Sequence, residues 1–196
     1  MKKIILLNGS PRTHGNTYQS LEMIQNIFKE NEIDSEIIQL GSMNIFGCKA
    51  CNGCYKNKNN KCSIDNDGLN EVINKVFNAD GLIIGSPTYY SNVTGNVKNF
   101  IDRCGYVNNA NGNYLKGKPG APIVSVRRSG GNFTYAAINF FFGINEMPII
   151  TSSYWNMTLS LKQGDVQKDE EGKQTFVNLA NNFVDFLRKM VLSKNT

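Results

Sequence analysis

Four of the chain's five cysteines lie within a single stretch of fifteen residues. They are Cys48, Cys51, Cys54 and Cys62. Four thiolates at close spacing are the usual ligands of an iron–sulfur cluster, so the pattern predicts a [4Fe–4S] site. Two alternatives stay open. A structural zinc ion also takes four thiolates, although zinc sites usually show two separated CxxC pairs, and free thiols without metal could simply shape a loop.

A second candidate site is the turn-rich segment NGSPRTHGNT at residues 8–17. Small residues and a proline before a helix expose several backbone N–H groups, and the helix dipole favours an anion there. The residues that could hold a terminal phosphate are Ser10, Arg12, Asn16 and Thr17. The segment lacks both GxGxxG and the lysine of a P-loop. In the alternative interpretation, Ser10 or Asn16 caps the helix and Arg12 is solvated. His14, the single histidine, is expected to be a surface residue.

Two further loops carry candidate ligand-binding groups. The first follows the apolar run 81–85 and offers flat aromatic faces beside polar groups, at Pro87, Thr88, Tyr89, Tyr90, Ser91 and Asn92. Such a loop suits a planar heteroaromatic ring, although the two tyrosines could instead pack under the next helix. The second follows the run 121–126, where Ser129 and Gly130 open another helix beside Arg127 and Arg128. A turn required by backbone geometry alone is the alternative there.

Short apolar runs alternate along the chain with segments of helical periodicity. The runs predict strands at 3–7, 35–40, 81–85, 121–126 and 149–152, and the periodic segments predict helices at 16–28, 67–77, 96–104, 132–142 and 176–191. This alternation predicts an α/β fold, a doubly wound parallel sheet in the order 2-1-3-4-5 with helices on both faces. We expect one domain over 1–196, with a loop at 158–172.

The cysteine-rich insertion at 48–62 follows the second predicted strand. Ligands of such sheets bind beyond the carboxyl ends of the strands, near the switch point between strands one and three. We therefore expect the cysteines to lie beside the crevice formed by the three loops. Cys104, flanked by Phe100 and Ile101, is interpreted as a small core residue without a functional role.

Composition narrows the classes of partner. The net charge is +5, and the 21 lysines and arginines are scattered rather than concentrated in a basic stripe, which argues against a nucleic-acid partner. The apolar run after Lys3 ends at Asn8, too short for a signal-peptide core, and no stretch approaches the roughly 20 apolar residues of a membrane span. We expect a cytoplasmic protein without a membrane partner, in which cysteines stay reduced.

Taken together, these motifs resemble the flavodoxin-like NAD(P)H-dependent FMN reductase family, in particular its iron–sulfur flavoprotein branch. The resemblance rests on residues 9–12 with 15–17, on 86–90, on the four clustered cysteines, and on Tyr154-Trp155-Asn156. By this resemblance, Ser10, Arg12, Asn16 and Thr17 would hold the FMN phosphate, and residues 87–92 would frame the isoalloxazine, with Ser129 and Gly130 on its other side.

The resemblance also implies an activity. FMN would take a hydride from NAD(P)H and reduce a small acceptor such as a quinone, a flavin or a nitroaromatic, with no catalytic side chain of its own. The alternative is an electron carrier that relays electrons from ferredoxin through the cluster to FMN. Family members are commonly homodimers or homotetramers. The chain shows no separate NAD(P)H-binding fingerprint, so the nicotinamide would use the open face of the flavin.

Overall fold

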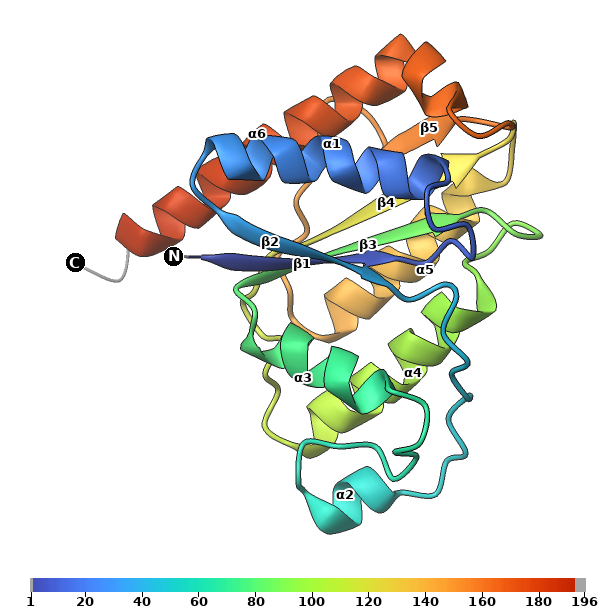
Figure 1. The fold of residues 1–196 in the computed structure, drawn as a ribbon. Helices are drawn as coiled ribbons and strands as arrows, with labels where there is room; N and C mark the ends of the chain where they lie inside the picture. The colour runs from blue at the N-terminus through green and yellow to red at the C-terminus, as the bar shows by residue number, and fades with distance from the viewer. Residues whose placement is uncertain (1, 193–196) are drawn as a thin grey trace.

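The chain folds around a parallel sheet of five strands in the order β2-β1-β3-β4-β5, which confirms the predicted topology (Figure 1). The structure, a computed structural model, describes residues 2–192. The strands are β1 (Lys3–Asn8), β2 (Asp34–Gln39), β3 (Gly81–Pro87), β4 (Gly120–Val126) and β5 (Met157–Leu159). All four neighbouring pairs run parallel, so the carboxyl ends of the strands meet at one edge.

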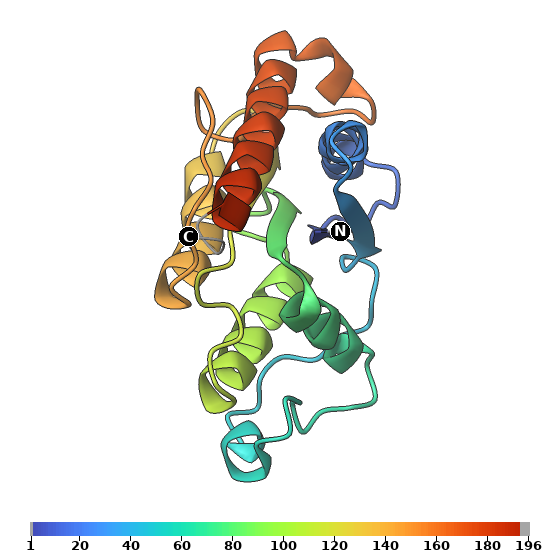
Figure 2. The same ribbon diagram turned by 90° about the vertical axis from the view of Figure 1, so that its left-hand side faces the viewer.

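Helices cover both faces of the sheet (Figures 1 and 2). They are α1 (Asn16–Glu30), α2 (Gly53–Asn57), α3 (Leu69–Asn78), α4 (Gly95–Ala110), α5 (Gly131–Ile144), the 3₁₀ helix η1 (Asp165–Lys168) and α6 (Glu170–Leu192). The helices α1 and α6 lie on one face, and α3, α4 and α5 lie on the other. None of the helices among the described residues is long and apolar enough to cross a bilayer.

Alternation along β1 shows why both faces are buried. Ile4 and Leu6 point into the core beneath α1 and α6, whereas Ile5 and Leu7 point into the core beneath α3, α4 and α5. All four side chains are fully buried. A continuous apolar run is what a central parallel strand requires, because neither of its faces meets water.

The predicted fifth strand at 149–152 is wrong. Ile149 forms only an isolated bridge with Gly120, and the strand proper is β5, where Met157 pairs with Val124. Between these two pairings β4 advances four residues while the outer segment advances eight. The extra residues loop out of the sheet and carry Tyr154 and Trp155 to the surface, where both are at least half exposed. A segment at the edge of the sheet pairs with one neighbouring strand only. Its apolar run indicates burial but does not show where that pairing is interrupted.

Two further predictions need correction. Residues 158–172 are not one loop, since they contain the end of β5, η1 and the first turn of α6. The cysteine segment, residues 48–62, follows β2 as predicted but does not lie beside the crevice of the same chain. It contains α2, which packs against α4 on the side away from the sheet (Figures 1 and 2).

Candidate functional site

The loops after β1 and β3 are joined directly at the carboxyl edge of the sheet. The N–H of Gly9 donates to the carbonyl of Gly85 at 2.8 Å, and the hydroxyl of Thr94 donates to the carbonyl of Gly9 at 2.8 Å. A Cβ on Gly9 would lie 2.6 Å from the Gly85 carbonyl oxygen and would overlap Val97. Glycine is therefore required at this position, where the two loops meet at the switch point between β1 and β3.

Two of the four predicted phosphate ligands are buried and already bonded. The Ser10 hydroxyl accepts the N–H of Arg12 at 3.1 Å, and the Thr17 hydroxyl donates to Ser125 at 3.1 Å. Arg12 is exposed. Ser10 therefore shapes the turn that presents Arg12, and Thr17 ties α1 to β4. The capping alternative is wrong, because α1 begins at Asn16 after Gly15 with no side-chain cap.

Asn16 connects the β1–α1 loop to the segment after β5. Its side-chain amide donates to the carbonyl of Lys162 at 2.9 Å, and its oxygen accepts the N–H of Gly164 at 2.9 Å. Because no side chain caps α1, the first backbone N–H groups of the helix remain open to an anion beside the Arg12 cation. His14 is exposed, as predicted, and packs edge-on against Tyr18.

The predicted ring-framing segment after β3 forms a tight turn. Tyr89 and Asn92 exchange both backbone hydrogen bonds, at 2.9 and 3.0 Å. The two residues between them have positive φ, 49° at Tyr90 and 59° at Ser91, a conformation that costs energy for residues other than glycine and clusters at functional sites. The Tyr90 side chain is fully exposed, so the alternative in which it packs under α4 is wrong. The turn presents a tyrosine ring to whatever binds at this edge.

The loop after β4 packs against this turn. Gly130 has φ +85°, and a Cβ there would lie 2.5 Å from the Ser91 hydroxyl oxygen. Ser129 is exposed beside it, and the carbonyl of Ser125 accepts the N–H of Thr88 at 2.9 Å. The structure thus brings the segments 87–92 and 129–130 into direct contact at Ser91 and Gly130. Their placement on two sides of an isoalloxazine ring stays a prediction.

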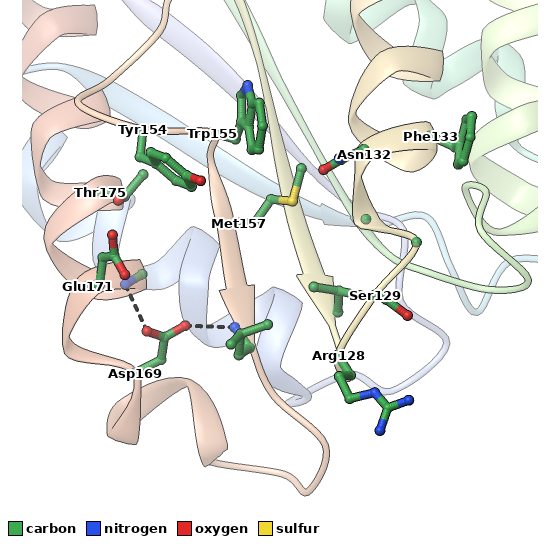
Figure 3. Close-up of a pocket in the computed structure, with 15 residues that line it drawn as sticks. Arg128, Ser129, Asn132, Phe133, Tyr154, Trp155, Met157, Asp169, Glu171 and Thr175 are labelled. Carbon is green, nitrogen blue, oxygen red and sulfur yellow. Dashed lines mark hydrogen bonds between the residues drawn. The ribbon is translucent and has the colours of Figure 1, made fainter.

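A cavity of about 440 Å³ opens on the other side of the β4–α5 loop (Figure 3). Its walls come from that loop, from β5 with its looped-out residues, and from the start of α6. Trp155 and Met157 lie across from Asn132, while Tyr154 lies toward α6 (Figure 3). Asp169 accepts the N–H groups of Leu159 at 2.6 Å and Gly172 at 3.0 Å, which fixes α6 to β5. A cavity that combines the aromatic rings of Phe133, Tyr154 and Trp155 with polar side chains suits a small planar molecule.

The four clustered cysteines line one small cavity of about 20 Å³, together with Arg103 and Tyr106 of α4. Cys54 is buried, Cys62 is partly buried, and Cys48 and Cys51 are exposed. Among residues 2–192, no three His, Cys, Asp or Glu side chains converge as ligands of one metal ion. The four cysteines therefore share the lining of one cavity, and the binding of a cluster or an ion there stays a prediction.

Backbone N–H groups point at two of the sulfurs. Ala50 N–H donates to Cys48 Sγ at 3.4 Å, and the N–H of Gly53, with the hydroxyl of Ser63, lowers the pKa of Cys51. Burial, by contrast, raises the pKa of Cys54. Ala50 and Asn52 have positive φ, 50° and 56°, and this strained backbone turns the N–H groups toward the thiols. N–H donors stabilise thiolate ligands, so four cysteines of which two accept such bonds suit an iron–sulfur cluster.

Sequence reasoning missed the residues of α4 that bind the stretch 40–46, which leads from β2 into the cysteine segment. Asn96 donates to the carbonyls of Leu40, Gly41 and Met43 at 3.0, 3.1 and 2.8 Å. Asn99 donates to the carbonyl of Ile45 at 3.0 Å, and Arg103 to that of Phe46 at 3.1 Å. The spacing Asn96, Asn99, Arg103 places three polar side chains on one helix face. That spacing was the available signal, an unexpected polar stripe on a helix that packs against the sheet.

A sequence profile of the NADPH-dependent FMN reductase family matches residues 2–161. The match spans β1 to the end of β5 and includes the loops after β1, β3 and β4. The chain belongs to this family. It is an oxidoreductase of the FMN reductase type.

Relatives of this FMN reductase-type protein also match over nearly the whole chain. An iron–sulfur flavoprotein of Archaeoglobus fulgidus is 35% identical, over 93% of this chain and 94% of that protein. An iron–sulfur flavoprotein of Methanocaldococcus jannaschii is 32% identical, over 95% and 98%. Among solved structures, FerB, a flavoenzyme NAD(P)H:acceptor oxidoreductase of Paracoccus denitrificans, superposes with a TM-score of 0.71 over 96% of this chain and 98% of FerB. At 15% identity this last likeness shows the fold alone.

Proposed function

We propose that this protein uses FMN to transfer reducing equivalents from NAD(P)H to a small acceptor such as a quinone, a free flavin or a nitroaromatic. The observation that carries the proposal is the convergence of three loops at the carboxyl edge, where Gly9 meets Gly85 and Gly130 meets Ser91. Family membership supports FMN as the group that these loops hold.

Different parts of the edge would hold different parts of the cofactor. Arg12 and the uncapped start of α1 offer a cation and open N–H groups to the phosphate. Ser10, Asn16 and Thr17 shape this place through their bonds to Arg12, Gly164 and Ser125. The rigid turn at 89–92, with Ser129 and Gly130 against it, offers backbone groups and an aromatic face to the isoalloxazine.

The hydride and electron chemistry would belong to FMN, which accepts two electrons from a nicotinamide and releases them singly or in pairs. The chain's own residues bind and orient. The aromatic cavity at Trp155 adjoins the loop that carries Ser129 and Gly130, and we assign the small acceptor to it. The cavity lies on the side of the β4–α5 loop away from the 89–92 turn. The acceptor in this cavity and the nicotinamide would therefore approach the flavin from different directions.

A second candidate function is electron transfer between proteins, in which ferredoxin delivers electrons through a [4Fe–4S] cluster at the four cysteines. The observation that favours it is the cavity that these cysteines share, in which backbone N–H groups donate to the sulfurs of Cys48 and Cys51. The iron–sulfur flavoprotein relatives, similar over more than nine-tenths of the chain, add support.

We also propose that the protein is a homodimer built on α4 and α5. An apolar hollow of about 430 Å³ lies between these helices, and Phe140 and Ile144 beside it are 75% and 76% exposed. Apolar side chains clustered in this way on a surface mark an interaction site. A second copy is the simplest partner, because an isologous contact pairs the same apolar patch with itself.

One preparation tests both candidate functions. Protein purified without oxygen is assayed for FMN, iron and sulfide, and is then mixed rapidly with NADPH, NADH or reduced ferredoxin. Flavin bleaching by a nicotinamide, followed by turnover with a quinone, supports the reductase. Reduction by ferredoxin alone supports the carrier. Protein that binds no FMN after reconstitution contradicts both.

A further inference from the structure

Arg103 is a charged residue at a position where a helix normally carries an apolar one. It lies on α4, and neither its side chain nor that of its ion-pair partner Asp67 is exposed to solvent. Its neighbours on the helix, Phe100, Cys104 and Val107, belong to the core. A buried charge is retained only when it is paired and hydrogen-bonded, because leaving water is costly. Its hydrogen bonds therefore show what it does.

The guanidinium ties together the two ends of the cysteine segment. One terminal nitrogen of Arg103 donates to the carbonyl of Phe46 at 3.1 Å, just before the segment, and contacts Asp67. The other donates to the carbonyl of Ile64 at 2.8 Å, just after the segment, and to Asp67 at 3.2 Å. Asp67 in turn accepts the N–H of Phe46 at 3.1 Å. Both ends are thereby fixed to one point on α4.

One donor of Arg103 is left over. Its Nε–H is buried and has no hydrogen-bond partner among the described residues, and Arg103 lines the cavity that the four cysteines share. Cys62 lies on the same side of Arg103 and lines this cavity with it, although no hydrogen bond of normal geometry joins the Nε–H to its sulfur. Native proteins rarely leave a buried N–H unpaired, so an orphan beside four thiols points to an acceptor at that place.

We propose that Arg103 is the positioning residue of the four-cysteine centre, which fixes both ends of the cysteine segment and reserves its Nε–H for a sulfur of the bound iron–sulfur cluster. This assignment rests on the proposed cluster. An electron added to a cluster increases the negative charge on its sulfurs, so an N–H donor from a cation stabilises the reduced form and raises the reduction potential. Arg103 would thus set how readily the centre accepts an electron.

The test is the cluster's midpoint potential in matched variants of the full chain. Arg103→Lys keeps the cation but cannot reproduce the planar fork with its Nε–H. We expect about a tenfold loss in the cluster's affinity for an electron, a shift of about 59 mV to more negative potential for a one-electron couple. Iron and sulfide content and the FMN potential, measured in the same titration, serve as internal controls and should stay at wild-type values.

Asp67→Asn is the control for the ion pair. It removes a negative charge but leaves the Arg103 Nε–H in place, so its cluster potential should stay unchanged or rise. Should Arg103→Lys fail to fold, the double variant Arg103→Gln/Asp67→Asn, which leaves no unpaired charge, takes its place in the potential measurement. Labelling of metal-free protein with a thiol reagent shows whether Arg103 holds the cysteine segment in place, a role that we call the clamp. In the Arg103 variants Cys54 and Cys62 should react faster, while Cys104, fully buried in the core, should stay protected.

Four outcomes would overturn the assignment. A wild-type potential in the Arg103 variants would refute the Nε–H contact, and an equal negative shift in Asp67→Asn would assign the effect to the ion pair. Unchanged labelling of Cys54 and Cys62 would refute the clamp. Wild-type protein that binds neither iron nor sulfide after reconstitution would refute the cluster itself, a failure distinct from the other three because it needs no variant.

Discussion

Gly130→Ala is the substitution that tests most directly how the β3 turn and the β4 loop form one site. Gly130 has φ +85°, and an added Cβ would lie 2.5 Å from the Ser91 hydroxyl oxygen. The left-handed backbone costs a residue with a side chain about 1–2 kcal/mol, and overpacking costs about 1–3 kcal/mol. We expect the free energy of unfolding to fall by about 2–4 kcal/mol in urea titrations followed by circular dichroism.

The same substitution should weaken FMN binding, because relief of the overlap displaces the turn at 89–92. A loss of about tenfold in affinity corresponds to 1.4 kcal/mol and is measurable by quenching of flavin fluorescence. Ser91→Ala removes the oxygen that overlaps most, so the double variant should recover most of the overpacking cost and keep the backbone cost. Gly143→Ala, in α5 with open space around its Cβ position, is the matched control and should be neutral or stabilising. Gly130→Ala within about 0.5 kcal/mol of wild type, or a double variant that recovers nothing, would refute the reasoning.

Three further predictions concern other parts of the molecule. Trp155→Ala should raise KM for a planar acceptor by about tenfold without changing FMN content, and Trp155→Phe should restore it in steady-state assays; an unchanged KM would remove the acceptor from this cavity. Phe140→Glu should convert a dimer to monomers in light scattering, whereas a wild-type mass would place any interface elsewhere. Burial raises the pKa of Asp80, but its bonds to Lys2 and to the N–H of Lys3 lower this pKa overall. The stability that these bonds supply is therefore present above the unfolded pKa of about 3.9. It is lost as the pH falls through the folded pKa. Asp80→Asn should therefore cost about 1 kcal/mol at pH 7 and nothing near pH 2 in urea titrations, and an equal cost at both pH values would contradict this assignment.

The locations of the candidate ligand-binding loops could be derived from local patterns. The runs that contain Ile4 and Leu82 are continuously apolar, which predicts central parallel strands. Polar turns follow both runs at the carboxyl edge of the sheet. The direct contact between Gly130 and Ser91 was not predicted and came from the structure. The state of individual side chains did not follow, because Ser10 and Thr17 look like free hydroxyls in the sequence but are bonded to Arg12 and Ser125.

The sequence by itself determined the sheet order, the family and the grouping of four cysteines, because periodicity and close spacing are local properties that survive without a partner. Tertiary structure alone decided three things. It placed β5 at Met157–Leu159, since an edge strand pairs where the backbone N–H and C=O groups of its neighbour have no other partner. It placed the cysteine segment against α4, because Asn96, Asn99 and Arg103 bind the backbone of residues 43–46, which lead into that segment. It also turned Arg103 from one cation among 21 into a buried clamp, since burial depends on every element packed around a residue.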